Sequence, residues 1–454
     1  MSHPPTTPSP RVEPAAATAP NTSAAARSAG AALTSAYCEV RSRTEGLIAP
    51  LSPEDQVVQS MPDASPAKWH RAHTTWFFEE FVLGPNATGY EPADPSHRFL
   101  FNSYYEAVGP RQPRPRRGMI TRPSVDEITR YRRHVDAAML ALIDAVDQVD
   151  AADSELRGAV MDMVELGLNH EQQHQELILM DIKHLLFQNP LRPAYFSDRP
   201  SAPAPEVVGR AGWIDHPGGL VEVGHDGTGF AYDNERPRFT TYLQPFRIAD
   251  RLVTSAEWLE FMSDGGYRRP ELWLSDGWGL VQTDGWDAPL YWDRPADGTD
   301  ADWTVFTLEG DRPVEPADPV VHVSYHEADA FARWRGARLP TESEWEAVAA
   351  ANWWEPPSGR AAVHPAASGS PGTDDLGFGS EVWQWTQSAY LPYPGFAPAP
   401  GAVGEYNGKF MVSQHVLRGG SCATPPGHSR PTYRNFFPPS ARWAFSGVRL
   451  ASDA

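Results

Sequence analysis

Residues 166–176, which read Leu-Gly-Leu-Asn-His-Glu-Gln-Gln-His-Gln-Glu, decide how the N-terminal half of the chain is expected to fold. His170 and His174 stand four residues apart, so on a helix their imidazoles lie one above the other. Apolar residues continue this face on both sides, which places the pair on the buried stripe of an amphipathic helix. The geometry suits chelation of a metal. Core histidines that only pack together give the same pattern, so this stretch alone does not decide between the two.

Length and charge limit the classes of protein to which the chain can belong. At 454 residues it is too long for one hydrophobic core, so two or three domains are expected. Its 38 Lys and Arg residues stand against 58 Asp and Glu residues, and the net charge of -20 argues against binding nucleic acid through a basic surface. The two cysteines, Cys38 and Cys422, lie far apart, which excludes a disulfide framework and favours a reducing compartment.

The N-terminal segment 1–29 consists mostly of Pro, Ala, Thr and Ser and lacks the apolar core of a signal peptide. We interpret it as a disordered tail. No later segment offers the roughly 18 uninterrupted apolar residues that a membrane-spanning helix requires. The sequence therefore predicts a soluble, cytoplasmic protein with no membrane partner.

Residues 30–189 carry a helical pattern. Four helices are expected, at about 31–48, 65–83, 124–149 and 154–187, and the third opens with a capping box from Ser124 to Glu127. Helices of this length with short or crossover connections predict a four-helix bundle. The second helix carries His73 in the middle of its apolar stripe and His70 at the edge of that stripe.

The connection 86–123 is longer than a compact bundle needs, and loops of this size are usually functional or disordered. It contains Tyr104 and Tyr105, followed by five arginines at positions 111, 114, 116, 117 and 122. In an acidic protein this cluster predicts a positive site suited to bidentate capture of a carboxylate. The alternative is a solvated loop whose arginines pair with surface acids.

A Pro-rich linker, 190–205, separates the bundle from sequence of a different kind. Residues 206–454 are dense in Gly, Trp and Pro and contain short strands such as 220–223. Isolated helices are announced by capping boxes that begin at Thr254, Ser324 and Thr341. This pattern predicts an irregular α+β domain whose loops hold function.

A bundle can bring His73 from its second helix toward His170 and His174 on its fourth, because all three lie on faces that turn to the common core. Three neutral imidazoles suit a divalent metal such as iron, zinc or copper. His70 is the alternative third ligand. The segment 170–174 also matches the His-Glu-x-x-His pattern of zinc peptidases, with Glu171 as general base. That reading leaves the arginine loop and the second domain unexplained.

Several motifs in order give a family resemblance that covers nearly the whole chain after residue 29. Segments 69–79 (Trp-His-Arg-Ala-His-Thr-Thr-Trp-Phe-Phe-Glu) and 169–176 (Asn-His-Glu-Gln-Gln-His-Gln-Glu) resemble the DinB-type bundle of ergothioneine-pathway sulfoxide synthases, the hercynine oxygenases. Segments 321–334, 336–345, 382–386, 417–421 and 445–450 resemble the formylglycine-generating-enzyme (sulfatase-modifying factor) domain, a variant of the C-type lectin fold. The combination of the two domains is more specific than either half.

The resemblance implies a non-haem Fe(II) enzyme that uses O2 to join a thiol sulfur to the imidazole C2 of hercynine, Nα-trimethylhistidine, with oxidation of the sulfur to a sulfoxide. His73, His170 and His174 match the iron ligands of the family. Three neutral histidines leave the charge of the metal uncompensated and leave positions for an anionic thiolate, an imidazole and O2. The implied site is a cleft between the two domains, a common place for small ligands.

The resemblance also assigns roles to other side chains. Tyr104 or Tyr105 is the expected proton or hydrogen donor, and Arg114 and Arg117 are expected to hold the carboxylate of the thiol substrate. For hercynine, Gln173 and Asn435 match positions near its carboxylate and imidazole. Its quaternary ammonium is best met by aromatic faces, for which the candidates are Phe436, Phe437, Tyr393 and Trp443.

One departure from the family pattern concerns the thiol. Members that use γ-glutamylcysteine carry an acid and an arginine where this chain has Phe437 and Ala441, so cysteine is the expected donor. The formylglycine-generating activity is not expected, because Cys422 stands alone in its domain, and neither is ovothiol synthesis, because no methyltransferase sequence follows the lectin-like motifs. A selenoneine synthase, which joins a selenosugar to hercynine, is the closest alternative. A binding protein with an inactive metal site is the alternative outside the enzymes.

Overall fold

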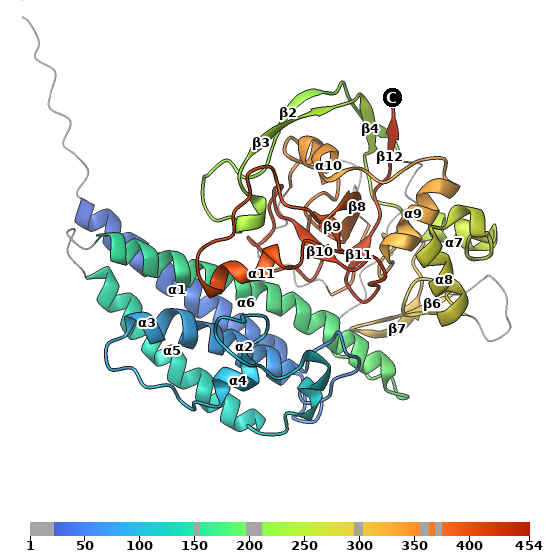
Figure 1. Ribbon diagram of the computed structural model, residues 1–454. Coiled ribbons are helices and arrows are strands. Elements are labelled where there is room, and N and C mark those ends of the chain that lie inside the picture. The colour runs from blue at the N-terminus through green and yellow to red at the C-terminus, as the bar shows by residue number, and fades with distance from the viewer. Residues whose placement is uncertain (1–21, 149–153, 197–210, 295–302, 355–362, 368–374) are drawn as a thin grey trace, which may run out of the picture.

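The computed structural model describes residues 22–148, 154–196, 211–294, 303–354, 363–367 and 375–454. A group of long helices from the N-terminal half packs beneath a second body of short strands and helices (Figure 1). The expected tail falls largely on residues 1–21 and the expected linker largely on residues 197–205, and both of these ranges lie outside the described residues.

The expected four-helix bundle is confirmed. Its helices are α1 (Thr22–Ile48), α2 (Ala67–Phe78), α5 (Val125–Asp147) and α6 (Ser154–Gln188), and the predicted capping box at Ser124 and Glu127 opens α5. Helix α2 runs on through a π-helical turn, Glu79–Leu83, into α3 (Gly84–Asn86). Helix α1 begins earlier than the expected start near Ala31, because the alanine-rich run before that residue has high helix propensity.

Helices α1 and α2 each pack against both α5 and α6. Their shared core is built from large side chains, including Trp76, Phe78, Val135 and Met139. Helix α6 can approach α2 closely because residue 167 is a glycine. A Cβ placed on Gly167 would lie 2.5 Å from the ring of Phe78. This close approach brings the histidine-bearing faces of α2 and α6 together.

The described residues of the second body form four small sheets. One has the strand order β10 (Asn435–Phe437), β9 (His415–Arg418), β8 (Trp383–Ala389) and β11 (Ser446–Gly447), and another has β1 (Trp213–His216), β4 (Phe246–Ala249) and β12 (Ala451–Asp453). The others pair β2 (Gly219–Val223) with β3 (Phe239–Leu243) and join β5 (Trp292–Asp293), β6 (Thr304–Thr307) and β7 (Gly310–Pro313). Most neighbours are antiparallel, and β8 pairs in parallel with β11.

Short helices surround these sheets. They are α7 (Ser255–Ser263), α8 (Ser275–Asp284), α9 (Tyr325–Trp334), α10 (Glu342–Ala349) and α11 (Glu405–Gly408). The three predicted capping boxes are confirmed at the starts of α7, α9 and α10. Within the described residues, no helix combines the length and the hydrophobicity needed to cross a membrane.

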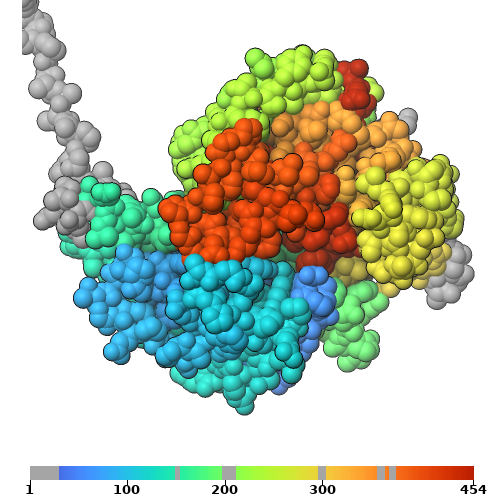
Figure 2. All heavy atoms as spheres, viewed as in Figure 1, coloured from blue at the N-terminus to red at the C-terminus, as the bar shows by residue number. Residues whose placement is uncertain are grey.

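Helix α6 belongs to both bodies. Its N-terminal half packs into the core of the bundle, whereas its C-terminal half, including Ile178 and Ile182, packs with Phe306, Val382 and Phe445 of the second body. The histidine pair lies between these two cores. The space-filling view shows the bundle and the second body in close contact along this boundary (Figure 2).

Polar contacts reinforce the boundary. The buried carboxylate of Glu176 accepts hydrogen bonds from Trp383 Nε1 at 2.6 Å, Ser421 Oγ at 2.8 Å and Thr424 Oγ1 at 2.7 Å. Glu405, at the start of α11, accepts from the backbone amides of residues 106 and 107, both at 2.9 Å. The second body therefore holds both α6 and the loop that carries Tyr104 and Tyr105.

Candidate active site

The structure brings three histidines together at the boundary. His73 comes from α2, and His170 and His174 come from α6; their ligand nitrogens all lie within 4.8 Å of one another. The Nε2 atoms of His73 and His170 are 3.2 Å apart. The three side chains are at most 9% exposed. His70, the alternative third ligand, is not a member of this set.

The donor set fits a divalent metal. His73 Nδ1 lies 2.6 Å from the carbonyl oxygen of Phe101, which can only accept a hydrogen bond, so Nδ1 carries the proton and Nε2 presents a lone pair. Burial lowers the pKa of His170 to about 4 and holds the pKa values of His73 and His174 well below the usual range. All three are thus neutral, the form that binds metals. Nitrogens about 2.1 Å from one ion stand roughly 3 Å from each other, which matches the spacing of His73 and His170.

The zinc-peptidase reading is wrong, because Glu171 points away from the histidines. Its carboxylate is fully buried and binds Arg41 at 2.7 Å, Arg132 at 2.5 Å and the Thr44 hydroxyl at 2.6 Å. Burial by itself would raise the pKa of Glu171, but Arg132 and Arg41 hold it at about 2. This carboxylate ties α6 to α1 and α5 and cannot act as a base at the metal site.

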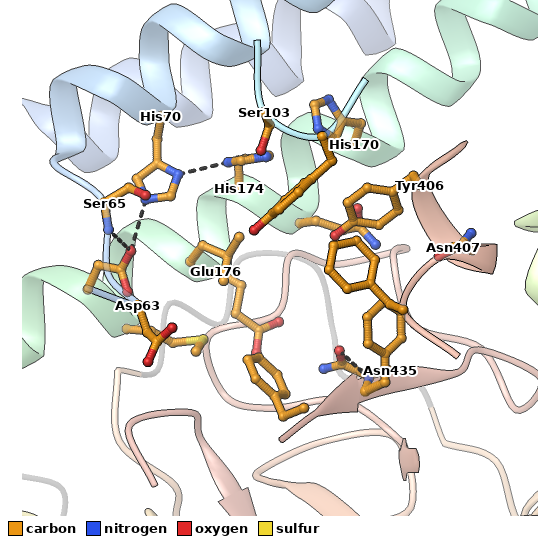
Figure 3. Close-up of a pocket in the computed structure, with 18 of the residues that line it drawn as sticks. Asp63, Ser65, His70, Ser103, His170, His174, Glu176, Tyr406, Asn407 and Asn435 are labelled. Atoms are coloured by element: carbon orange, nitrogen blue, oxygen red, sulfur yellow. Dashed lines mark hydrogen bonds and ion pairs between the residues drawn. The ribbon is translucent and has the colours of Figure 1, made fainter. Parts of the chain in front are cut away.

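A cavity of about 300 Å³ lies beside the three histidines, with walls from both domains. The bundle contributes α2, α6 and the loop between α2 and α5, and the second body contributes residues near 232, α11 and the segment that leads into and follows β10. Figure 3 shows Tyr406, Asn407 and Asn435 across this space from His170 and His174. The cavity has the size and the mixed lining of a small-molecule site.

The arginine loop divides into surface and pocket residues. Arg111 pairs with Glu106, Arg116 is exposed, and Arg122 bonds the carbonyl of Thr121 at the surface. Arg114 and Arg117 line the cavity. The predicted positive site thus describes Arg114 and Arg117, and the alternative of a solvated loop describes the other three arginines.

Arg117 is a buried cation that lines the cavity. It is 3% exposed, lies 3.3 Å over the Trp69 ring, and donates to Ser65 Oγ at 2.9 Å and Ser103 Oγ at 3.0 Å. Within the described residues no acid forms an ion pair with it, and burial lowers the pKa of Arg117 to about 9. Arg114, half-buried, donates to the Tyr104 hydroxyl at 2.6 Å. Such a pair of guanidinium groups is prepared for an anion from outside the protein.

The two tyrosines of the loop lie in different surroundings, although both line the cavity. Tyr104 accepts from Arg114 and packs edge-on against Phe410 with ring centroids 4.8 Å apart. Tyr105 is 3% exposed and packs against Trp76 and Phe81. Burial raises the pKa of Tyr105, so its hydroxyl keeps its proton at neutral pH. No hydrogen bond fixes that hydroxyl within the described residues.

Most candidate hercynine residues lie on the cavity wall. Gln173 donates from Nε2 to the Tyr433 hydroxyl at 2.7 Å, and Asn435 caps the backbone amide of Phe436 at 2.9 Å. Phe436, Phe437 and Trp443 also line the cavity, the last two with ring centroids 5.6 Å apart.

Tyr393 was expected to face the quaternary ammonium of hercynine, but the structure does not bring it to the cavity. Its hydroxyl accepts from Arg418 at 2.8 Å, and its ring lies 4.0 Å beneath the Arg434 guanidinium. Both arginines are held by the carboxylate of Glu342. Tyr393 therefore belongs to a buried ionic cluster behind the pocket, where its polar end finds a partner.

Several pocket residues were not identified from the sequence. Asp181 is one of them: it lies beside His70, the alternative third ligand, which in turn lies beside His174. The available signal was its spacing, seven residues after His174. Tyr433, Tyr406 and Phe410 also line the cavity. Tyr406 belongs to the four-residue helix α11, and Phe410 and Tyr433 lie outside helices and strands, so only the packing of the second body against the bundle places them there.

Comparisons with known proteins agree with this architecture. A family model described as the DinB superfamily matches residues 36–178, and the Sulfatase-modifying factor enzyme 1-like domain matches residues 202–368 and 357–454. The chain is 35% identical to the hercynine oxygenase of Mycolicibacterium smegmatis, over 68% of this chain and 75% of that protein. It is 33% identical to the hercynine oxygenase of Mycolicibacterium thermoresistibile, over 86% and 88%. Ergothioneine biosynthesis protein 1 of Schizosaccharomyces pombe is 24% identical, over 73% of this chain and 44% of that protein.

Proposed function

The chain belongs to the hercynine oxygenase family, and from this premise we propose that it is a non-haem Fe(II)- and O2-dependent sulfoxide synthase of ergothioneine biosynthesis. In this proposal it joins the sulfur of a small thiol to the imidazole C2 of hercynine. Residues 30–189 form the metal-binding bundle, and residues 206–454 form the domain that closes the pocket.

One observation carries the proposal: a neutral three-histidine set shares one cavity at the domain boundary with two arginines that form no ion pair with an acid among the described residues. Histidines alone leave the charge of a divalent metal uncompensated, so an anionic thiolate is a favoured additional ligand. Arginines nearby suit a carboxylate on the same small molecule. An amino acid that carries both a thiol and a carboxylate fits this pairing of sites.

Iron, when bound, supplies the reaction with dioxygen. The protein supplies orientation and protons. Arg114 and Arg117 hold the substrate carboxylate, and the fixed stacking of Arg117 on Trp69 keeps its guanidinium directed at the cavity. Tyr105 is the candidate proton donor, because its hydroxyl is protonated and not fixed by a described partner. Tyr104 is more constrained, since Arg114 donates to its oxygen.

Hercynine would lie between Gln173 of α6 and the wall formed by the second domain. Gln173 and Asn435 supply amide groups for its carboxylate and imidazole, and Phe436, Phe437 and Trp443 supply aromatic faces near its quaternary ammonium. Enclosure between two domains excludes water from the reacting groups.

Cysteine is the proposed thiol. Phe437 lines the cavity with an apolar ring, and Ala441 is 3% exposed within the core, so neither offers a charge for the glutamyl group of γ-glutamylcysteine. The selenoneine alternative finds no support among the relatives named above.

The test is turnover by the iron-loaded protein in air, with hercynine and one of three donors: cysteine, γ-glutamylcysteine or a selenosugar. Products are identified by mass spectrometry. A hercynine–cysteine sulfoxide supports the proposal. Reaction with the selenosugar alone would move the enzyme to the selenium branch, and the absence of any coupled product would reject the catalytic function.

A further inference from the structure

A chain of hydrogen bonds leads away from the metal site through His174. His70 Nδ1 lies 2.8 Å from His174 Nδ1, and His70 Nε2 lies 3.0 Å from Asp181 Oδ2. The backbone amide of Ser65 donates to the same Asp181 oxygen at 2.8 Å. All four side chains are at least nine-tenths buried. Figure 3 shows His70 between His174 and the segment that carries Ser65.

The carboxylate of Asp181 determines which atom donates in each of these hydrogen bonds. Asp181 can only accept, so His70 must carry its proton on Nε2 and present a lone pair on Nδ1. His174 must then donate from Nδ1 to His70, which leaves the Nε2 lone pair of His174 for a metal. The opposite direction would place the His70 Nε2 lone pair 3.0 Å from a carboxylate oxygen and would protonate His174 at Nε2, its remaining ligand atom.

We propose that His70 and Asp181 are positioning residues that hold His174 in its metal-binding tautomer and increase its strength as a ligand. A carboxylate behind a ligating imidazole raises the basicity of that imidazole and fixes the orientation of its ring. Here the carboxylate acts through a second imidazole. The inference deepens the proposed function, because it concerns the same metal site, but it does not depend on which reaction the metal serves.

The three histidines differ in the partner of the ring nitrogen that does not face the metal site. His73 donates to a neutral backbone carbonyl, and His170 Nδ1 has no partner within the described residues. Among the described residues, only His174 is joined by hydrogen bonds to a carboxylate, through His70. His174 is therefore expected to be the strongest electron donor of the three. Metal affinity should be most sensitive to substitutions of the residues bonded to His174.

Ser65 connects this chain to the anion site. Its backbone amide holds Asp181, and its hydroxyl accepts from Arg117 Nη1 at 2.9 Å. One residue thus sets the positions of the metal-supporting carboxylate and of the arginine that faces the substrate carboxylate.

The test is Co(II) binding to the metal-free full chain, followed by the absorption spectrum of the bound ion and by competition with a chelator. Asp181→Asn removes the charge, yet its amide oxygen can still accept from His70 and from Ser65. We expect Co(II) affinity to fall about 10- to 100-fold, with a shifted spectrum. The matched control is Glu79→Gln, which neutralises a buried carboxylate of the bundle that bonds Tyr90 and Tyr131, both at 2.7 Å, and no histidine of the metal site.

A second pair of variants keeps the test decisive if Asp181→Asn does not fold. His70→Gln retains an acceptor for His174 and a donor for Asp181, whereas His70→Leu retains neither. We expect His70→Gln to keep most of the affinity and His70→Leu to lose at least tenfold. Wild-type affinity in Asp181→Asn or in His70→Leu, or an equal loss in Glu79→Gln, would overturn the inference. Failure of the proposed reaction would instead appear as absence of sulfoxide in a protein that binds Co(II) as described.

Discussion

Replacement of Arg117 by Met should stabilise the protein and remove its capacity to bind the thiol substrate. Arg117 is a buried cation whose partners are two serine hydroxyls and the face of Trp69. Met keeps the unbranched stem and its contact with the ring, but it removes the charge. A residue retained at a cost in stability is expected where function needs it.

The magnitude follows from the pKa of Arg117, which burial lowers from 12.5 to about 9. At about 1.4 kcal/mol for each pH unit, holding the charge at neutral pH costs on the order of 5 kcal/mol. The penalty is complete at every pH below about 9 and is relieved as the pH rises from there toward 12.5, because the unfolded chain binds this proton more tightly. Two serine hydroxyls left without a donor cost about 1–2 kcal/mol each. The net gain is therefore about 1–3 kcal/mol, or a few degrees in Tm.

The assay is thermal unfolding of metal-free protein at neutral pH, with and without cysteine. Cysteine should raise the Tm of the wild type, since ligands stabilise the state that binds them, and should leave Arg117→Met unchanged. Arg116→Met is the control, because Arg116 is exposed on the same turn, and it should respond to cysteine as the wild type does. A variant at position 117 that is less stable than the wild type and is still stabilised by cysteine would refute this reasoning.

Three further predictions concern other parts of the molecule. His170→Ala should abolish retention of iron after gel filtration, and unchanged iron content would reject this ligand. Tyr105→Phe should leave substrate binding intact but divert turnover from sulfoxide formation to oxidation of the thiol alone; a normal partition of products would move the role to Tyr104. Lys183 is fully buried, with its Nζ 2.7 Å from His322 Nε2, and burial lowers the pKa of Lys183 to about 7. The cost of its charge to the stability of the fold is therefore complete below pH 7 and decreases as the pH rises above 7. Lys183→Met should therefore raise the free energy of unfolding in urea more at pH 6 than at pH 9, and an equal effect at both values would contradict the account.

The sequence predicted the elements that depend on local patterns. The capping residues Ser124, Thr254, Ser324 and Thr341 each begin a helix as expected, because a cap needs only residues within one turn. Apolar periodicity also distinguished His73 from His70, since the central residue of a buried stripe points most directly at the facing helix.

The contacts that depend on packing between domains were not predictable in this way. Glu171 stands next to His170, and only the positions of Arg41 and Arg132 on two other helices show that its carboxylate faces away from the three histidines. Tyr393 has the aromatic ring expected of a residue that contacts a quaternary ammonium, but it instead contacts Arg418 and Arg434 in a buried ionic cluster. In both cases charged partners distant in the sequence decide the orientation of the side chain.

The central claim is that the protein joins hercynine to a thiol within one cavity and that the oxygen atom on the sulfur of the product comes from O2. The most direct measurement is a single turnover of the iron-loaded protein with hercynine and cysteine under 18O2, with the product analysed by mass spectrometry. The account predicts one product that contains both substrates and carries 18O on its sulfur. Oxidised cysteine together with unchanged hercynine would contradict it.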